Sequence, residues 1–326
     1  MIFSFVRCAS ASPYHVSIAR FQGDKAGAIS FTFDDGSQNQ ADVAVPLLDQ
    51  FGFKGTFYVV AGLTRERKSD PYLPGSSPAR LGGVSWEEWR QVAAEGHEIG
   101  NHSLTHPLLT RVRDAAALAR EINLSADIIA SEIGQPPITF AYPYNHFNRR
   151  VRNAVLARHA TARERWFDYG HRFFSLQDAN DKVDWAIRER RWFIVLIHGI
   201  EQGVNPLSRI IFRENLQYIK QREEYLWVDT FANISRYDME RRNARVSLLS
   251  STPTRLSFTV TCSCDPNRFA VPLTVVMGLP AAHVAGVSAS HQDQRDSLPV
   301  KTINREVLVD VVPGANPITV TWHPVG

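Results

Sequence analysis

A strand–helix–strand pattern near the start of the chain constrains the fold most. Residues 28–33 form a β-branched and aromatic run, residues 38–51 carry a helical pattern that Gly52 ends, and residues 55–60 are again apolar. A strand that is joined through a helix to the next strand pairs with it in parallel. The sequence therefore predicts an α/β fold built on a buried parallel sheet.

The first of these strands ends in two adjacent acids and a glycine, Asp34, Asp35 and Gly36. Adjacent side chains on an extended strand point to opposite faces, so the two carboxylates can take different roles where the chain turns. One of them can hold a metal ion while the other moves a proton.

Residues 96–106 contain the second polar cluster, in which His102 and His106 are four positions apart. On a single helical turn this spacing places both imidazoles on one side, a common way to present two metal ligands. With one aspartate they make a set of two histidines and one carboxylate. A histidine after a strand is more often a hydrogen-bonded structural residue, and only the combination with the acidic strand end favours a metal site.

Two later strands also end in polar groups. Residues 138–141 run into residues 142–144 (Tyr-Pro-Tyr), and the apolar residues 193–197 run into His198. Ligands of α/β sheets and barrels bind outside the carboxyl ends of the strands, so these groups are expected to converge. Helical patterns cover residues 85–94, 114–133, 148–158, 181–191, 208–221 and 231–243.

Beyond about residue 245 the apolar period changes to two, which predicts a small all-β domain of the sandwich type. The expected organisation is an N-terminal extension (1–25), a catalytic domain (26–243) and an all-β accessory domain (244–326). The last contains the aromatics Phe258, Phe269 and Trp322. They could stack on sugar rings, but a domain of this size needs most of its large residues for its own core.

Composition excludes some functions. With 36 basic and 33 acidic residues and no dense basic block, nothing indicates a nucleic-acid partner. No apolar run approaches the roughly 20 residues of a transmembrane helix. The N-terminus has a signal-like small-residue site at residues 9–11, but its apolar core is short and no basic region precedes it. Cys262 and Cys264 are too close for good disulfide geometry and are expected to be free thiols.

The two polar clusters together resemble a known family. Residues 32–36 (Thr-Phe-Asp-Asp-Gly) and 101–106 (Asn-His-Ser-Leu-Thr-His) are similar to the first two signature motifs of the polysaccharide deacetylases, the NodB-homology or carbohydrate esterase family four, which includes chitin, peptidoglycan and xylan deacetylases. The resemblance covers roughly residues 26–235. It implies a distorted (β/α) barrel with a divalent metal at its mouth, zinc first, with cobalt, nickel or manganese as alternatives.

The resemblance also implies residue roles. Asp34 matches the general base, and Asp35, His102 and His106 match the protein ligands of the metal. Three protein ligands leave coordination positions open for water and an acetyl carbonyl, the arrangement of a catalytic site. The metal would lower the pKa of the water while the base takes its proton.

Two further motifs match in part. Pro143 and Tyr144 match the third motif, so the Tyr144 backbone N–H is the candidate oxyanion donor. Ala141 stands where the family often has an arginine that orients the base, so another basic residue is needed. His198, after Leu196, matches the histidine that acts as general acid. Asp184, followed by a tryptophan, is a candidate to orient that histidine, although an ordinary helix position is an equal alternative.

The function implied is metal-dependent removal of an acetyl group from a carbohydrate, first an N-acetylglucosamine polymer or oligomer. The alternatives are an O-acetyl xylan esterase, a related C–N hydrolase acting on a small non-sugar amide, and an inactive carbohydrate-binding protein. The intact candidate site argues against the last. The resemblance slightly favours an extracytoplasmic or secreted protein, and it leaves the oligomeric state open.

Overall fold

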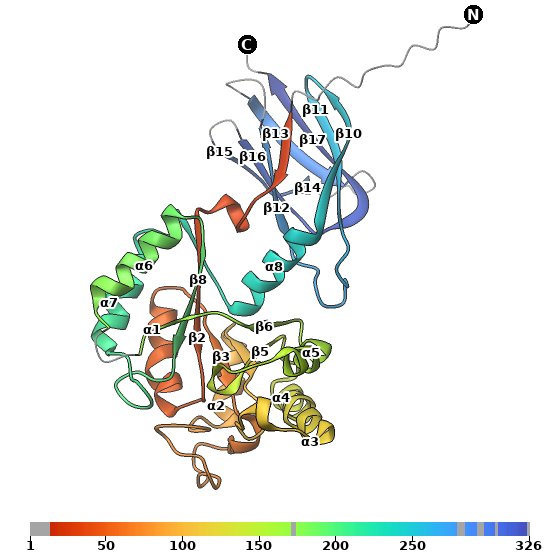
Figure 1. Ribbon diagram of the computed structural model, residues 1–326. Helices are drawn as coiled ribbons and strands as arrows, with labels where there is room; N and C mark the ends of the chain where they lie inside the picture. The colour runs from red at the N-terminus through yellow and green to blue at the C-terminus, as the bar shows by residue number, and fades with distance from the viewer. Residues whose placement is uncertain (1–13, 171–173, 279–283, 292–296, 304–305, 325–326) are drawn as a thin grey trace, which may run out of the picture. The chain divides into compact units, whose positions relative to one another are not determined.

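A computed structural model describes residues 14–170, 174–278, 284–291, 297–303 and 306–324 (Figure 1). The chain divides into two compact units. One is Lys25–Arg236, and the other combines the residues before Lys25 with those from Tyr237 onward. The described residues before Lys25, which belong to the expected N-terminal extension, therefore cluster with the all-β part of the chain.

The unit Lys25–Arg236 is built on a parallel sheet. Its strands are β2 (Gly27–Phe33), β3 (Thr56–Val59), β4 (Glu98–Asn101), β5 (Thr139–Ala141), β6 (Thr161–Arg163), β7 (Phe167–Asp168), β8 (Trp192–Ile197) and β9 (Leu226–Val228). The order along the sheet is β6-β5-β4-β3-β2-β8-β7, and β9 pairs with the first residues of β2. The pairs are parallel, as the strand–helix–strand pattern predicts.

The helices of this unit lie outside the sheet (Figure 1). They are α1 (Val45–Gln50), α2 (Trp86–Ala94), α3 (Ala115–Ala119), α4 (Ser125–Ile133), α5 (Arg149–Arg158), α6 (Leu176–Arg188) and α7 (Arg209–Lys220). The next helix, α8 (Phe231–Asn243), begins within this unit and continues past its last residue, Arg236. Sequence signals explain several ends: Ser85 and Glu88 form a capping box at the start of α2, and Gly134 ends α4 in the left-handed conformation. Helix α6 begins earlier than predicted because Ser175 and Asp178 form a second capping box.

Alternation along β2 separates a core face from an interior face. Ile29, Phe31 and Phe33 pack into the main hydrophobic core, whereas Thr32 and Asp34 face the other way. Both faces of β2 are buried. This burial explains why its sequence is a mostly apolar run that ends in an acid.

The interior face carries a polar layer from strands that are not neighbours. Arg163 on β6 donates to Thr32 on β2 and lies over the ring of Tyr58 on β3, whose hydroxyl accepts from Thr139 on β5. Because β6 and β2 are far apart in the sheet order, this contact requires the sheet to curl around a common interior. The predicted distorted (β/α) barrel is confirmed, in a form in which no pairing joins β6 to β7 among the described residues.

The other unit contains two antiparallel sheets. One has the order β1-β12-β16-β15 and the other β10-β11-β17-β13-β14. Their bounds are β1 (His15–Ile18), β10 (Ala244–Thr252), β11 (Arg255–Cys262), β12 (Leu273–Gly278), β13 (Val284–His291), β14 (Ser297–Leu298), β15 (Val300–Ile303), β16 (Glu306–Val311) and β17 (Gly314–Pro324). Residues of both sheets share one core, as expected of a sandwich.

The aromatic residues of this unit serve mainly that core. Phe258 and Trp322 are buried in it, and Tyr14 packs edge-on against Trp322. Strand β1, where the sequence showed no periodic pattern, pairs with β12. Cys262 and Cys264 are free thiols, as expected.

None of the helices in the described residues is both long and apolar enough to cross a membrane.

Candidate active site

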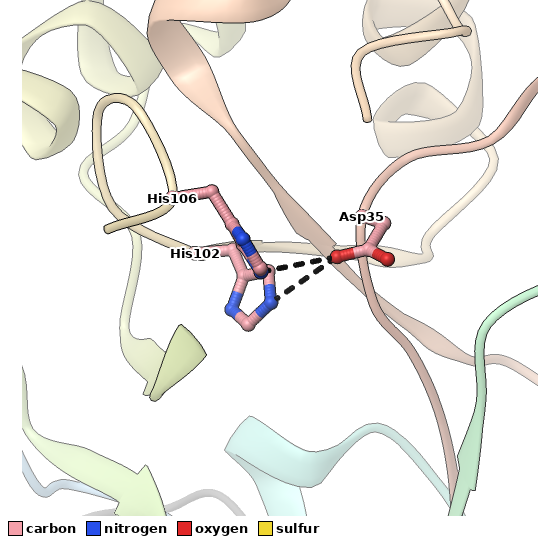
Figure 2. Close-up of side chains that lie close together, drawn as sticks. All are labelled: Asp35, His102 and His106. Atoms are coloured by element: carbon pink, nitrogen blue, oxygen red, sulfur yellow. Dashed lines mark ion pairs between the residues drawn. The ribbon is translucent and has the colours of Figure 1, made fainter. Parts of the chain in front are cut away.

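Three predicted metal ligands converge at the carboxyl ends of β2 and β4 (Figure 2). Asp35 Oδ1 lies 3.3 Å from His106 Nε2 and 3.5 Å from His102 Nε2. Figure 2 shows the Asp35 carboxylate facing both imidazoles. Zinc bonds of about 2.1 Å at tetrahedral angles place neighbouring ligand atoms about 3.4 Å apart, so both distances suit donors that share one ion. All three ligand atoms lie within 4.8 Å of one another.

The hydrogen bonding of His102 supports the same fit. Its Nδ1 lies 2.8 Å from the carbonyl oxygen of Ala141, so Nδ1–H donates and the Nε2 lone pair is left facing Asp35. Metal-binding histidines commonly fix their second nitrogen in this way. The side chain is buried among β4 and β5, so the ring orientation is set by the sheet.

The backbone around the two histidines is not helical, so the predicted helical turn is wrong. His102 follows β4 directly, and both Ser103 and His106 have positive φ values, 69° and 60°. Ser103 Oγ accepts a hydrogen bond from the His106 backbone N–H at 3.0 Å. The chain thus reverses in a tight turn, and this turn brings the second imidazole back toward the first.

Asp34, the predicted base, faces a residue that the motif analysis missed. Arg163 Nη1 donates to Asp34 Oδ1 at 2.8 Å, and Nη2 donates to Oδ2 at 2.5 Å. The Arg163 side chain is fully buried and that of Asp34 is 3% exposed. Arg163 is paired in register with Ala141, the position where the family often has its arginine. Arg163 lies within residues 161–170, where the sequence shows only a weak apolar pattern, so periodicity gives no signal for the strand that carries it.

Electrostatics keep both carboxylates ionised. Burial raises the pKa of Asp34, but the positive charges of Arg163 and His102 outweigh it, and the pKa is lowered. Burial likewise raises the pKa of Asp35, but the imidazoles of His102 and His106 beside it outweigh burial and bring the pKa well below its usual range. Ionised carboxylates are the form that a metal ligand and a general base both require.

The two histidines respond differently to the same surroundings. For His102, burial lowers the pKa but Asp34 and Asp35 outweigh it, so the pKa is raised. For His106, burial lowers the pKa more than the facing Asp35 carboxylate raises it, so the pKa is lowered. His102 lies within reach of both acids, with Asp34 Oδ2 at 3.9 Å, which explains the difference.

His198, the predicted acid, is held at the end of β8 through its main chain. Its carbonyl oxygen accepts hydrogen bonds from Ser37 Oγ at 2.9 Å and from Gln40 Nε2 at 2.7 Å. Gln40 Nε2 also donates to the carbonyl oxygen of Asp34 at 2.5 Å. The buried amide of Gln40 therefore ties together the strand ends that carry the predicted base and the predicted acid.

The structure does not bring Asp184 to His198. Asp184 lies on α6, where its carboxylate accepts hydrogen bonds from the Tyr218 hydroxyl on α7 at 2.8 Å and from Arg222 Nε, in the turn after α7, at 3.2 Å. The buried Nδ1 of His198 has no hydrogen-bond partner among the described residues. Asp184 therefore links helix α6 to helix α7 in the outer layer of the unit.

Tyr144 lies beside the metal ligands. It sits in the turn Pro143–Asn145 with φ of 59°, and its ring centroid is 4.7 Å from that of His106. The side chain is 61% exposed. The predicted oxyanion turn and the predicted metal ligands therefore share one mouth of the barrel.

A second group of metal-type side chains, Asp49, Glu95 and His97, has a structural explanation. His97 Nδ1 accepts the Gly55 N–H at 3.0 Å, so Nε2 carries the proton and donates to Asp49 Oδ1 at 3.2 Å. Lys54 Nζ also pairs with Asp49. Both nitrogens of His97 are thus used within the protein.

Comparison with known proteins agrees with the geometry. Residues 22–161 match the family model described as polysaccharide deacetylase. The chain contains a polysaccharide deacetylase domain. The matched residues include Asp34, Asp35, His102, His106 and Tyr144, whereas Arg163 and His198 follow them.

Relatives of this deacetylase domain have several named activities. The chain is 34% identical over 129 residues to the peptidoglycan-N-acetylmuramic acid deacetylase PdaC of Bacillus subtilis, covering 39% of this chain and 23% of that protein. It is 31% identical over 133 residues to a chitooligosaccharide deacetylase of Rhizobium leguminosarum, covering 39% of this chain and 53% of that protein. A gellan lyase of a Bacillus species is 25% identical over 295 residues, 79% of this chain and 11% of that protein. The chain thus spans 11% to 53% of these relatives' lengths.

Proposed function

We propose that this protein hydrolyses acetyl groups from a carbohydrate, with an N-acetylglucosamine polymer or oligomer as the first candidate substrate. The observation that carries the proposal is the convergence of Asp35, His102 and His106 beside the buried Asp34–Arg163 pair. Two of the named relatives are deacetylases of peptidoglycan and of chitooligosaccharides, which supports this substrate class.

In this proposal Asp35, His102 and His106 hold a divalent ion, with zinc as the first candidate. When bound, the ion supplies Lewis-acid activation of water and of the acetyl carbonyl. The Asp34 carboxylate accepts the proton of the attacking water. Cobalt, nickel and manganese remain alternatives because the same donor set suits each of them.

The remaining groups complete the reaction. The Tyr144 backbone N–H stabilises the oxyanion that forms at the acetyl carbonyl. His198 donates a proton to the departing amine, so that acetate and the free amine are the products. Because an acetyl ester passes through the same type of tetrahedral intermediate, the substrate panel must include esters as well as amides.

The test is acetate release from chitooligosaccharides, peptidoglycan, gellan and acetylated xylan. Each reaction is run with protein treated with a chelator and then reloaded with zinc, cobalt, nickel or manganese. We expect release from at least one amide substrate, loss on chelation and recovery on reloading. Protein that elemental analysis shows to be loaded, yet that releases no acetate from any of these polymers, would refute the proposal.

We also infer that the protein acts outside the cytoplasm, because the polymers named for its relatives include the cell-wall polymer peptidoglycan. Fractionation of cells that produce the natural protein should find it in the extracytoplasmic fraction. Recovery in the cytoplasmic fraction alone would contradict this inference.

A further inference from the structure

Arg163 contacts three residues from two separate parts of the site with one side chain. Its guanidinium donates to Thr32 Oγ1 at 2.8 Å, to both oxygens of Asp34, and to Asn145 Oδ1 at 3.1 Å. Thr32 and Asp34 belong to β2 and its end, and Asn145 belongs to the turn Pro143–Asn145. One rigid group therefore connects the predicted base with the predicted oxyanion turn.

The geometry of the Asp34 contact suits orientation. A guanidinium that meets a carboxylate through two parallel N–H groups fixes the plane of the carboxylate as well as its distance. Each carboxylate oxygen keeps a second lone pair, so the pairing leaves Asp34 able to accept a proton. Burial of both side chains excludes competing water and strengthens the interaction.

The turn that Arg163 contacts needs an anchor. Tyr144 and Asn145 both have positive φ, 59° and 55°, a conformation that residues with a Cβ adopt at a cost in energy. Such a backbone persists only where surrounding contacts hold it. The hydrogen bond from Arg163 to the Asn145 side chain is one of these contacts, and it acts on the residue next to Tyr144.

The position of Arg163 explains how the site works without an arginine at residue 141. Ala141 and Arg163 are paired in register on the parallel strands β5 and β6, so their side chains emerge on the same face one strand apart. The guanidinium then reaches Asp34 across the barrel interior rather than from the neighbouring strand.

We propose that Arg163 is a positioning residue that holds the Asp34 carboxylate and the Tyr144–Asn145 turn in one fixed arrangement. This inference rests on the proposed function, since the base and the oxyanion donor are roles in that reaction. It goes further by assigning one buried side chain to align two catalytic groups that follow different strands of the curled sheet, β2 and β5.

The main variant is Arg163→Lys, which keeps the charge but cannot form the two-pronged contact. We expect kcat to fall by about 10²-fold or more, the scale of a misplaced base, while KM and metal content change little. Ala141→Arg combined with Arg163→Ala returns a guanidinium to the adjacent strand and should recover part of the kcat lost in Arg163→Ala. Arg65→Ala is the matched control: Arg65 is also buried but donates to Asp70 and Gln38, and this change should leave kcat unchanged.

A second readout does not depend on turnover. Hydrogen exchange of the peptide covering residues 142–147 should become faster in Arg163→Lys and stay unchanged in Arg65→Ala. If the wild type releases no acetate but this exchange difference appears, the proposed function fails and the anchoring of the turn stands.

The inference is overturned by any of three results in a wild type that is active. These are an Arg163→Lys kcat within about twofold of wild type, loss of bound metal together with activity, and unchanged exchange over residues 142–147 despite a fall in kcat. The last would mean that Arg163 acts on Asp34 alone.

Discussion

The buried histidine His97 should make the stability of the unit Lys25–Arg236 depend on pH. Its side chain is fully buried, and its Nδ1 accepts a backbone hydrogen bond, so protonation would remove that bond and bury a charge. Burial lowers the pKa of His97 from 6.5 to about 4, with Asp49 opposing and Lys54 assisting the shift. Between these two pH values the unfolded chain binds a proton that the folded protein does not.

The direction and the size of the change in stability with pH follow from this difference in proton binding. Unfolding takes up a proton below pH about 6.5, so the contribution of His97 to stability is fully present above that pH and is lost as the pH falls toward 4. A shift from 6.5 to about 4 corresponds to about 3 kcal/mol at 1.4 kcal/mol per pH unit. Most of this loss should occur between about pH 6 and pH 4.5.

The measurement is urea unfolding followed by tryptophan fluorescence at pH 7 and at pH 5, for wild type and His97→Gln. Trp89 is a suitable reporter because it is buried against Phe57, which also contacts the His97 ring. Other histidines titrate in both proteins, so the difference between the two pH dependences isolates His97. We expect the free energy of unfolding to fall more between pH 7 and pH 5 in wild type than in His97→Gln, by about 2 kcal/mol. Equal pH dependences in the two proteins would refute the reasoning.

Further predictions concern the candidate site. His102→Ala and His106→Ala should each lose bound metal and activity together, since each removes one of three protein ligands; full metal occupancy by elemental analysis in either variant would contradict the assignment. Asp34→Asn should retain metal but lose about 10²- to 10⁴-fold in turnover, whereas Asp35→Asn should lose metal as well; equal metal content and equal residual activity would show that the roles are not divided. Gln40→Met should lower the free energy of unfolding by about 1 to 3 kcal/mol, because the Asp34 carbonyl loses the Gln40 donor and the His198 carbonyl keeps only Ser37 Oγ; an unchanged urea midpoint would rule this out.

Much of the candidate site could be predicted because its signals are local in sequence. Asp34 and Asp35 end an apolar run, and the turn at residues 102–106 follows another, so strand patterning alone places these groups at one edge of the sheet. The motif spacing then indicates which residue types act together. The start of α2 at Ser85 and the end of α4 at Gly134 could also be predicted from the sequence, since capping depends on residues that are close along the chain.

Other features could not be predicted because they depend on contacts between distant residues. The spacing of His102 and His106 fits a helical turn as well as the tight turn that occurs, and only the backbone after β4 decides between them. Strand β1 has no clear apolar alternation, and it forms because β12 offers a free edge. Asp184 is followed by a tryptophan, as in the family motif, but it lies on the outer layer, where α7 and the turn after it supply its partners.

The sequence by itself determined the parallel α/β core, the separate all-β part and the identity of the candidate ligands, because periodicity and strand-end chemistry are written in adjacent residues. The tertiary structure alone decided the partner of Asp34. Arg163 lies 129 positions from Asp34 along the chain, and the two meet only because the sheet curls until β6 faces β2 across its interior. A buried ion pair of this kind carries no local signal, since its energy depends on the burial that the completed fold provides.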